Sequence, residues 1–211
     1  MQTTNFFRFC GIGLVTIFFS FNLNAQTYPN KPVTVIVPFS AGSASDVVTR
    51  VLLEKVSNNT NTRFVFDNRP AAGGNVGTAA VVKADPDGYT IGLSTSGPLA
   101  VNKILNPELG YDPERDLQPI ALFAVLPNII VVSSTLNINT LSQLNDYIRK
   151  TPDVGYGSVG NGSSQHLAGA YYEQLLGAKM LHVPYRVTAN MVTDLVAGRV
   201  PISFQLLPNV S

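Results

Sequence analysis

The chain has 211 residues, with 14 Lys and Arg against 13 Asp and Glu. Hydrophobic residues make up 45% of the sequence and charged residues 13%, about half the roughly 25% of an average globular protein, which excludes a disordered chain. The near-neutral balance argues against a nucleic-acid surface and against a polybasic membrane patch. Cys10 is the only cysteine and lies in a predicted leader, which excludes a disulfide framework, a thiolate metal cluster and a cysteine nucleophile from the mature protein.

The first 25 residues have the pattern of a secretory signal peptide. Arg8 and the amino terminus give a positive start, residues 9–21 carry no charge, and Leu23-Asn24-Ala25 resembles a cleavage site. The alternative is an uncleaved anchor, but this stretch is shorter than the about 20 residues that a spanning helix needs. We expect cleavage after Ala25 and an exported, most simply periplasmic, protein.

Strands and helices alternate in the first half of the mature chain. The pattern predicts strands at 33–37, 63–67 and 89–93, with helices at 46–56 and 78–84 between them. The β-α-β-α-β order implies a parallel, doubly wound sheet. In the first helix, the apolar residues with the spacing of a shared face are Val47, Val51, Leu52 and Val56.

A second α/β block follows two apolar runs, 119–126 and 128–133, which are placed to cross between lobes. Thr140 is expected to cap a helix that runs to about Lys150. The pattern then predicts, in chain order, a strand ending at Gly155-Tyr156, a helix at 165–176, a strand at 179–183, a helix at 188–197 and a strand at 199–206.

Two Ser/Gly loops each follow a predicted parallel strand and open a helix. They span residues 39–46 and 157–164, with a weaker third candidate at Thr95-Ser96-Gly97. Ligands of open α/β sheets bind at the carboxyl ends of the strands, where the first helical N–H groups lack intrahelical partners and the helix dipole is positive. Each loop can also be an ordinary capped turn. Taken together, the two loops predict an anion pocket that needs no Lys or Arg.

Three single residues have alternative roles. Asp46 lies in a first helical turn, which favours capping over ligand contact. His166 begins the second helix and is suited either to donate to a ligand carboxylate or to bond locally, whereas His182, inside an apolar strand, reads as a core histidine. Their spacing predicts no metal site.

Motifs of other functions are weak. Gly155, Gly157 and Gly160 spell G-x-G-x-x-G, but the preceding strand is short and an exported protein has little access to dinucleotides. The sequence has no P-loop and no G-x-S-x-G elbow, and its spacing reveals no Ser/His/Asp set. An exported enzyme that acts on carboxylates remains an alternative to a protein that only binds them. We expect no cofactor.

Several segments, in order, resemble the Bug-type receptors, the extracytoplasmic solute-binding proteins of tripartite tricarboxylate transporters. The segments are Tyr28-Pro29-Asn30-Lys31-Pro32-Val33, Val37-Pro38-Phe39-Ser40-Ala41-Gly42 with Asp46, Asp67-Asn68-Arg69-Pro70-Ala71-Ala72-Gly73-Gly74-Asn75, Ala84-Asp85-Pro86-Asp87-Gly88-Tyr89-Thr90, residues 156–168 and His182-Val183-Pro184-Tyr185. The resemblance covers residues 28–207.

The resemblance implies an α/β fold of the two-lobed periplasmic binding protein (Venus flytrap) type, with doubly wound, mainly parallel sheets. The first lobe would span 26–117 and the second 118–211. The implied function is capture of a small carboxylate (a di- or tricarboxylate, an amino acid or an aromatic acid) for membrane permease subunits. The implied ligand-binding residues are Phe39, Ser40, Ala41, Gly42, Ser43, Ala44, Asp46, Thr95, Ser96, Ser158, Gly160, Asn161, Gly162, Ser163, Ser164 and His166.

The sequence departs from the family pattern at several positions. Ser43 and Ala44 stand where glycines are common, and Pro201 and Gln205 stand where the family usually has Asp. Pro201 would remove a ladder donor from the last strand. The chain also stops just past that strand, whereas family members continue, so an incomplete first lobe is expected. A truncated product without a transport role, or a sensory partner, is therefore the third hypothesis.

Overall fold

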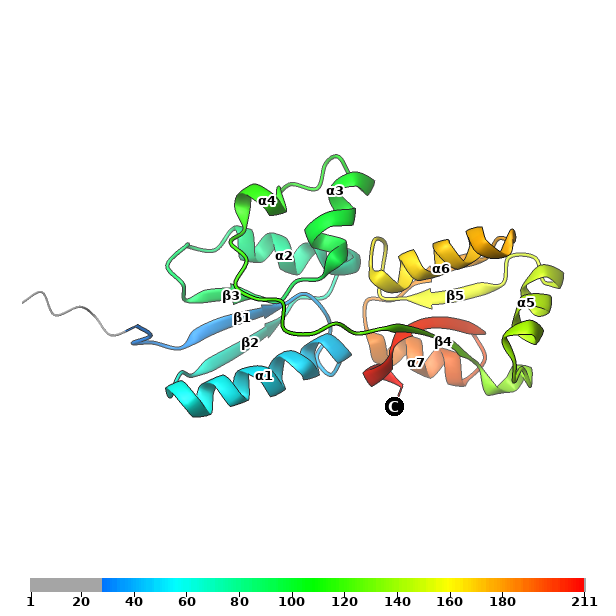
Figure 1. Cartoon of the computed structure of the whole chain (residues 1–211), viewed down its shortest axis with the longest axis horizontal. Helices are drawn as coiled ribbons and strands as arrows, with labels where there is room; N and C mark the ends of the chain where they lie inside the picture. The colour runs from blue at the N-terminus through cyan, green and yellow to red at the C-terminus, as the bar shows by residue number, and fades with distance from the viewer. Residues whose placement is uncertain (1–27, 211) are drawn as a thin grey trace, which may run out of the picture. The chain divides into compact units, whose positions relative to one another are not determined.

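The computed structural model of the chain describes residues 28–210 (Figure 1). The predicted leader, 1–25, and its cleavage site lie outside the described residues. Among residues 28–210, no helix combines the length and the apolar character needed to cross a membrane.

The first sheet has three parallel strands in the order β2-β1-β3. They are β1 (Val33–Val37), β2 (Phe64–Asn68) and β3 (Thr90–Gly92). Helices α1 (Ala44–Thr60) and α2 (Asn75–Val82) lie on opposite faces of this sheet (Figure 1). The central strand reads Val-Thr-Val-Ile-Val and is almost wholly buried, as expected of a β-branched run covered on both faces.

The predicted apolar face of α1 is wrong. Val47 and Val51 are exposed, at 44% and 64%, whereas Thr49 is buried and Leu53 packs on the first-sheet core. Asp46 sets this rotation because its carboxylate bonds to Asn68 at the end of β2, which turns the 46, 49, 53 row toward the sheet.

The second sheet has four strands in the order β4-β7-β5-β6. They are β4 (Asn128–Val132), β5 (Gly155–Ser158), β6 (Leu181–Pro184) and β7 (Ile202–Leu206). Only β4 runs antiparallel, against β7, within this sheet. Helices α6 (Ser164–Leu176) and α7 (Thr188–Val196) lie on opposite faces of this sheet (Figure 1). As predicted, Thr140 caps α5 (Leu141–Lys150), and it does so with the full reciprocal capping box.

The two sheets repeat one topology that the sequence does not reveal as a repeat. In the first, β1-α1-β2-α2-β3 gives the spatial order 2-1-3; in the second, β5-α6-β6-α7-β7 gives 6-5-7. The central strands β1 and β5 are therefore equivalent. Each lies at the point where the winding direction reverses, and ligands of open α/β sheets bind there.

Short helices that were not expected from the sequence include a π-helical turn (Gly97–Val101), α3 (Asn102–Leu105) and α4 (Pro113–Asp116). The predicted last strand also begins too early. Pro201 precedes β7, and its carbonyl oxygen accepts the Ser133 N–H, so the proline removes no donor from the β7 ladder.

Candidate functional site

The loops that follow the central strands β1 and β5 are built alike. Ser43 caps α1 and Ser163 caps α6, with ψ of 159° and 157°, and each hydroxyl accepts the backbone N–H three residues on. One residue before each cap is a left-handed glycine, Gly42 at φ 77° and Gly162 at φ 73°. A left-handed backbone is natural for glycine, and in both loops it aims the chain into the helix.

The side chain at the third helical position holds the glycine in each loop. The Gly42 N–H donates to Asp46 Oδ2 at 2.9 Å, and the Gly162 N–H donates to His166 Nδ1 at 3.1 Å. Asp46 and His166 thus occupy equivalent positions, and each fixes the conformation of its loop by accepting the glycine N–H. This geometry favours positioning over ligand contact for both.

Asp46 holds the first loop with an ionised carboxylate. Burial acts to raise the pKa of its carboxyl group, but hydrogen bonds from Arg50, Asn68 and the Gly42 N–H outweigh this and hold the pKa below its ordinary value. The carboxylate, 2% exposed, accepts the Arg50 Nε–H and an Asn68 amide hydrogen, each at 2.9 Å. It therefore stays ionised and fully engaged in the loop.

The second loop rests on a pair of stacked histidines. The rings of His166 and His182 lie 4.2 Å apart, and His182 Nε2 lies 2.6 Å from the buried Ser158 hydroxyl. Burial lowers the pKa of both rings, and the nearby His166 helps to bring that of His182 to about 4. Both imidazoles are neutral at physiological pH, which leaves His166 Nδ1 free to accept the Gly162 N–H.

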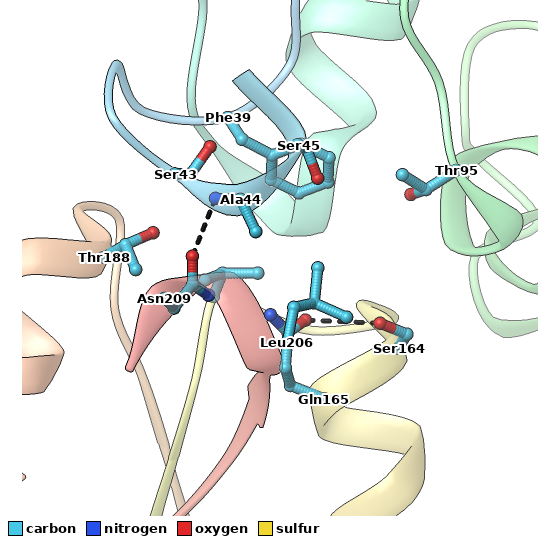
Figure 2. Close-up of a pocket in the computed structure, with 11 residues that line it drawn as sticks. Phe39, Ser43, Ala44, Ser45, Thr95, Ser164, Gln165, Thr188, Leu206 and Asn209 are labelled. Atoms are coloured by element: carbon cyan, nitrogen blue, oxygen red, sulfur yellow. Dashed lines mark hydrogen bonds between the residues drawn. The ribbon is translucent and has the colours of Figure 1, made fainter. Parts of the chain in front are cut away.

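A hollow lies between the starts of α1 and α6 (Figure 2). Its volume is about 20 Å³, room for about one water, so a larger molecule enters only when the walls move apart. None of its lining residues carries an ionisable side chain. They are Phe39, Ser43, Ala44, Ser45, Thr95, Val159, Ser164, Gln165, Thr188, Leu206 and Asn209.

One helical N–H of α1 already has an acceptor in this hollow. The Ala44 N–H donates to Asn209 Oδ1 at 2.7 Å (Figure 2), and Asn209 Nδ2 donates to Gln205 Oε1 at 3.0 Å. Gln205 Nε2 in turn donates to the Ser203 hydroxyl at 2.7 Å. An amide oxygen of the chain itself therefore occupies the acceptor position at the start of α1.

Close backbone approaches bring the second loop against the first-sheet side of the hollow. A Cβ at Gly97 would overlap the Gly162 carbonyl oxygen, and one at Gly73 would overlap the Asn161 carbonyl oxygen. A Cβ at Gly160 would lie 2.7 Å from the Gly73 nitrogen. On the far rim, the Ser40 hydroxyl bonds Thr188 and the Arg186 Nε–H donates to the Pro70 carbonyl oxygen at 2.8 Å. Residues without a side chain are required at Gly73, Gly97 and Gly160, because the main chains nearly touch there.

The structure brings only part of the sequence-predicted set to the hollow. The predicted residues that line it are Phe39, Ser43, Ala44, Thr95 and Ser164. The other predicted residues, which shape the loops or lie outside the lining, are Ser40, Ala41, Gly42, Asp46, Ser96, Ser158, Gly160, Asn161, Gly162, Ser163 and His166.

Six lining residues are absent from the predicted ligand-binding set, although the first two lie within the predicted loops: Ser45, Val159, Gln165, Thr188, Leu206 and Asn209. Ser45, Val159 and Gln165 belong to the two loops and their first helical turns. Leu206 lies at the carboxyl end of β7, so it could have been predicted from the rule that identified the loops, namely that ligands bind at the carboxyl ends of strands. Among the described residues, no group of three or more His, Cys, Asp or Glu side chains is placed to hold a metal.

This arrangement, two doubly wound sheets with helix starts around a hollow, is that of a periplasmic binding protein. Two solved structures from R. palustris share it: one with adipate (TM-score 0.82, 33% identity, 86% of this chain and 61% of that one) and MatC with bound malate (TM-score 0.80, 27% identity, 86% and 62%). The predicted two-lobed α/β fold is confirmed, while the lobe limits 26–117 and 118–211 remain a prediction.

The chain belongs to the TctC family, the tripartite tricarboxylate transporter family receptors, whose sequence profile matches residues 48–211. BugT of Bordetella pertussis is 32% identical over 212 residues, which cover 100% of this chain and 65% of BugT. The Bug-type resemblance is thereby confirmed. The chain spans less than two thirds of the length of this relative and of both solved structures.

Proposed function

We propose that the protein is an exported solute-binding receptor that captures a small carboxylate between its two sheets and delivers it to membrane permease subunits of a tripartite transporter. Support comes from the family and from the adipate and malate that two similar structures contain. Export would follow cleavage after Ala25, and the lobes would be 26–117 and 118–211.

The observation that carries the proposal is the bond from the Ala44 N–H to Asn209 Oδ1 in the hollow. It supports α1 as a donor to an acceptor oxygen there, and the equivalent start of α6 lies across the hollow with Ser164 in its lining. A ligand carboxylate would displace the Asn209 amide oxygen, since a charge-assisted bond is about twice as strong as a neutral one. Because the hollow is small, capture requires a hinge motion.

We propose binding without chemical conversion. The Ser–His pair next to the second loop, Ser158 with His182, supports this, because Ser158 is fully buried and does not line the hollow. Turnover of a bound acid would favour the rival, an exported enzyme acting on carboxylates.

Thermal unfolding with a panel of di-, tri- and aromatic carboxylates tests the proposal. A ligand at 100 times its Kd adds about 2.7 kcal/mol to the free energy of unfolding, a shift that is easily measured. One acid class should raise Tm. If no acid in the panel moves a cooperative transition, the proposal is wrong.

A proline variant removes the proposed donor itself. Ala44 is the first residue of α1, where proline fits the helix and removes only an N–H without an intrahelical partner. Ala44→Pro should weaken binding about 10- to 150-fold, the equivalent of the 1.5–3 kcal/mol of a hydrogen bond to a charged group. Leu141→Pro is the matched control, at the first position of α5 and outside the lining of the hollow; it should leave affinity unchanged.

A further inference from the structure

We infer that Gln205, which does not line the hollow, sets the ligand affinity of the site by orienting the Asn209 amide, whose oxygen competes with the ligand for the start of α1. Gln205 is then a positioning residue, and Asn209 is an internal competitor. The inference rests on the proposed function, because it concerns the affinity of the same site. It stands on a series of hydrogen bonds whose direction is fixed at both ends.

This series, the amide relay, joins β5 to the start of α1. The Ser203 hydroxyl donates to the Gly157 carbonyl oxygen at 3.1 Å and accepts a hydrogen from Gln205 Nε2 at 2.7 Å. Gln205 Oε1 accepts from Asn209 Nδ2 at 3.0 Å, and Asn209 Oδ1 accepts the Ala44 N–H at 2.7 Å (Figure 2). The relay therefore runs from the central strand of the second sheet to a helix of the first.

The two ends of the amide relay fix its direction. A backbone carbonyl oxygen only accepts, and a backbone N–H only donates. If the Asn209 amide were turned over, its NH₂ would face the Ala44 N–H and its oxygen would face Gln205 Oε1. Gln205 and Ser203 are fully buried, so a mismatch at Gln205 would carry the cost of an unsatisfied buried group. Gln205 thus holds Asn209 with its oxygen toward Ala44.

Asn209 is a competitor rather than a fixed part of the wall. Its side chain is only partly buried, and Leu207 and Pro208, which share its 3-10 helix, are exposed. Its bond to the Ala44 N–H is neutral, about half as strong as the charge-assisted bond of a carboxylate. A carboxylate can therefore replace the amide oxygen, but the affinity is reduced by the free energy needed to break the existing bond.

Removal of the competitor tests the inference by isothermal titration with malate, adipate, citrate and benzoate. In Asn209→Ala, each acid that binds should bind about 2- to 13-fold more tightly than in the wild type, the equivalent of the 0.5–1.5 kcal/mol of a neutral hydrogen bond. Asn58→Ala is the matched control, because it truncates the same side chain at an exposed site about 21 Å along α1 from Ala44. It should leave the affinity unchanged.

A second variant separates positioning from contact. Gln205→Met keeps the size of the side chain and leaves Asn209 in place, but it removes the amide that orients Asn209. The variant should also bind the acid more tightly, by less than Asn209→Ala, whereas a structural defect in a buried strand would weaken binding. Without any acid, the Ala44 N–H should exchange with solvent faster in Gln205→Met than in the wild type, which amide hydrogen exchange followed by NMR measures.

The outcomes separate this inference from the proposed function. Binding that is no tighter in Asn209→Ala than in the wild type would overturn the inference and leave the proposed function standing. An Ala44 N–H that exchanges equally slowly in a cooperatively folded Gln205→Met would overturn the positioning role of Gln205. If none of the four acids binds to the wild type or to either variant, the inference and the proposed function are both wrong.

Discussion

Closure of the hollow should depend on Gly97, which needs no contact with the ligand. A Cβ at this position would overlap the Gly162 carbonyl oxygen and lie 3.2 Å from its carbonyl carbon. The Gly97 φ lies outside the left-handed region, so alanine suits its backbone, and the added methyl would clash only with the backbone of the second loop at Gly162. Gly97→Ala therefore perturbs the approach of the second loop.

The expected cost follows from overpacking, about 1–3 kcal/mol when a methyl is forced into a filled space. Binding should weaken by roughly 5- to 150-fold. Isothermal titration with the acid identified in the panel measures this. Gly155→Ala is the matched control, because its Cβ would lie at an ordinary 3.6 Å from Val183 Cγ2. Affinity within twofold of wild type for Gly97→Ala would show that the two walls do not close on each other as the structure has them.

Two further predictions concern stability. Asp46→Asn should lower the free energy of unfolding by about 1–3 kcal/mol in urea titrations, because it leaves buried donors poorly matched, whereas Asp67→Asn, an exposed partner of Arg69, should cost no more than about 1 kcal/mol. Burial, with a smaller effect of the nearby His166, holds the pKa of His182 at about 4 in the folded protein, against 6.5 in the unfolded chain, so on acidification the unfolded chain takes up the proton first. The free energy of unfolding is therefore highest above pH 6.5 and should fall by roughly 2 kcal/mol between pH 7 and pH 5. An equal fall in the His182→Gln variant would contradict this origin.

Most elements of the fold could be predicted from local pattern. The Val-Thr-Val-Ile-Val run, the turn residues and the Thr140 capping signal each act within a few positions of the chain, so the sequence reveals them. The rotation of α1 could not be predicted in this way. It depends on a bond between Asp46 and Asn68, which are 22 residues apart.

The candidate site divides in the same manner. The strand-end rule identified both loops because each loop is contiguous in sequence. Asn209 escaped it, since its role depends on a short 3-10 helix (Leu207–Asn209) that folds back against Ala44, 165 residues away. The topological repeat could not be recognised from the sequence either, because equivalent positions carry different residues. Asp46 and His166, for example, each hold a glycine N–H, one with a carboxylate and the other with an imidazole.

That difference gives the two loops unequal electrostatics. A carboxylate in the first turn of α1 offsets part of the positive field that the helix start presents to an anion, whereas the neutral His166 leaves the field of α6 undiminished. Arg50 pairs with Asp46 at 2.9 Å, but it comes four residues further along α1, so at the helix start it offsets the carboxylate's charge only in part. The start of α6 should therefore hold the more strongly bound carboxylate. Acid should also disrupt the loop at the start of α6 before the loop at the start of α1, because a proton on His166 Nδ1 removes the acceptor of the Gly162 N–H.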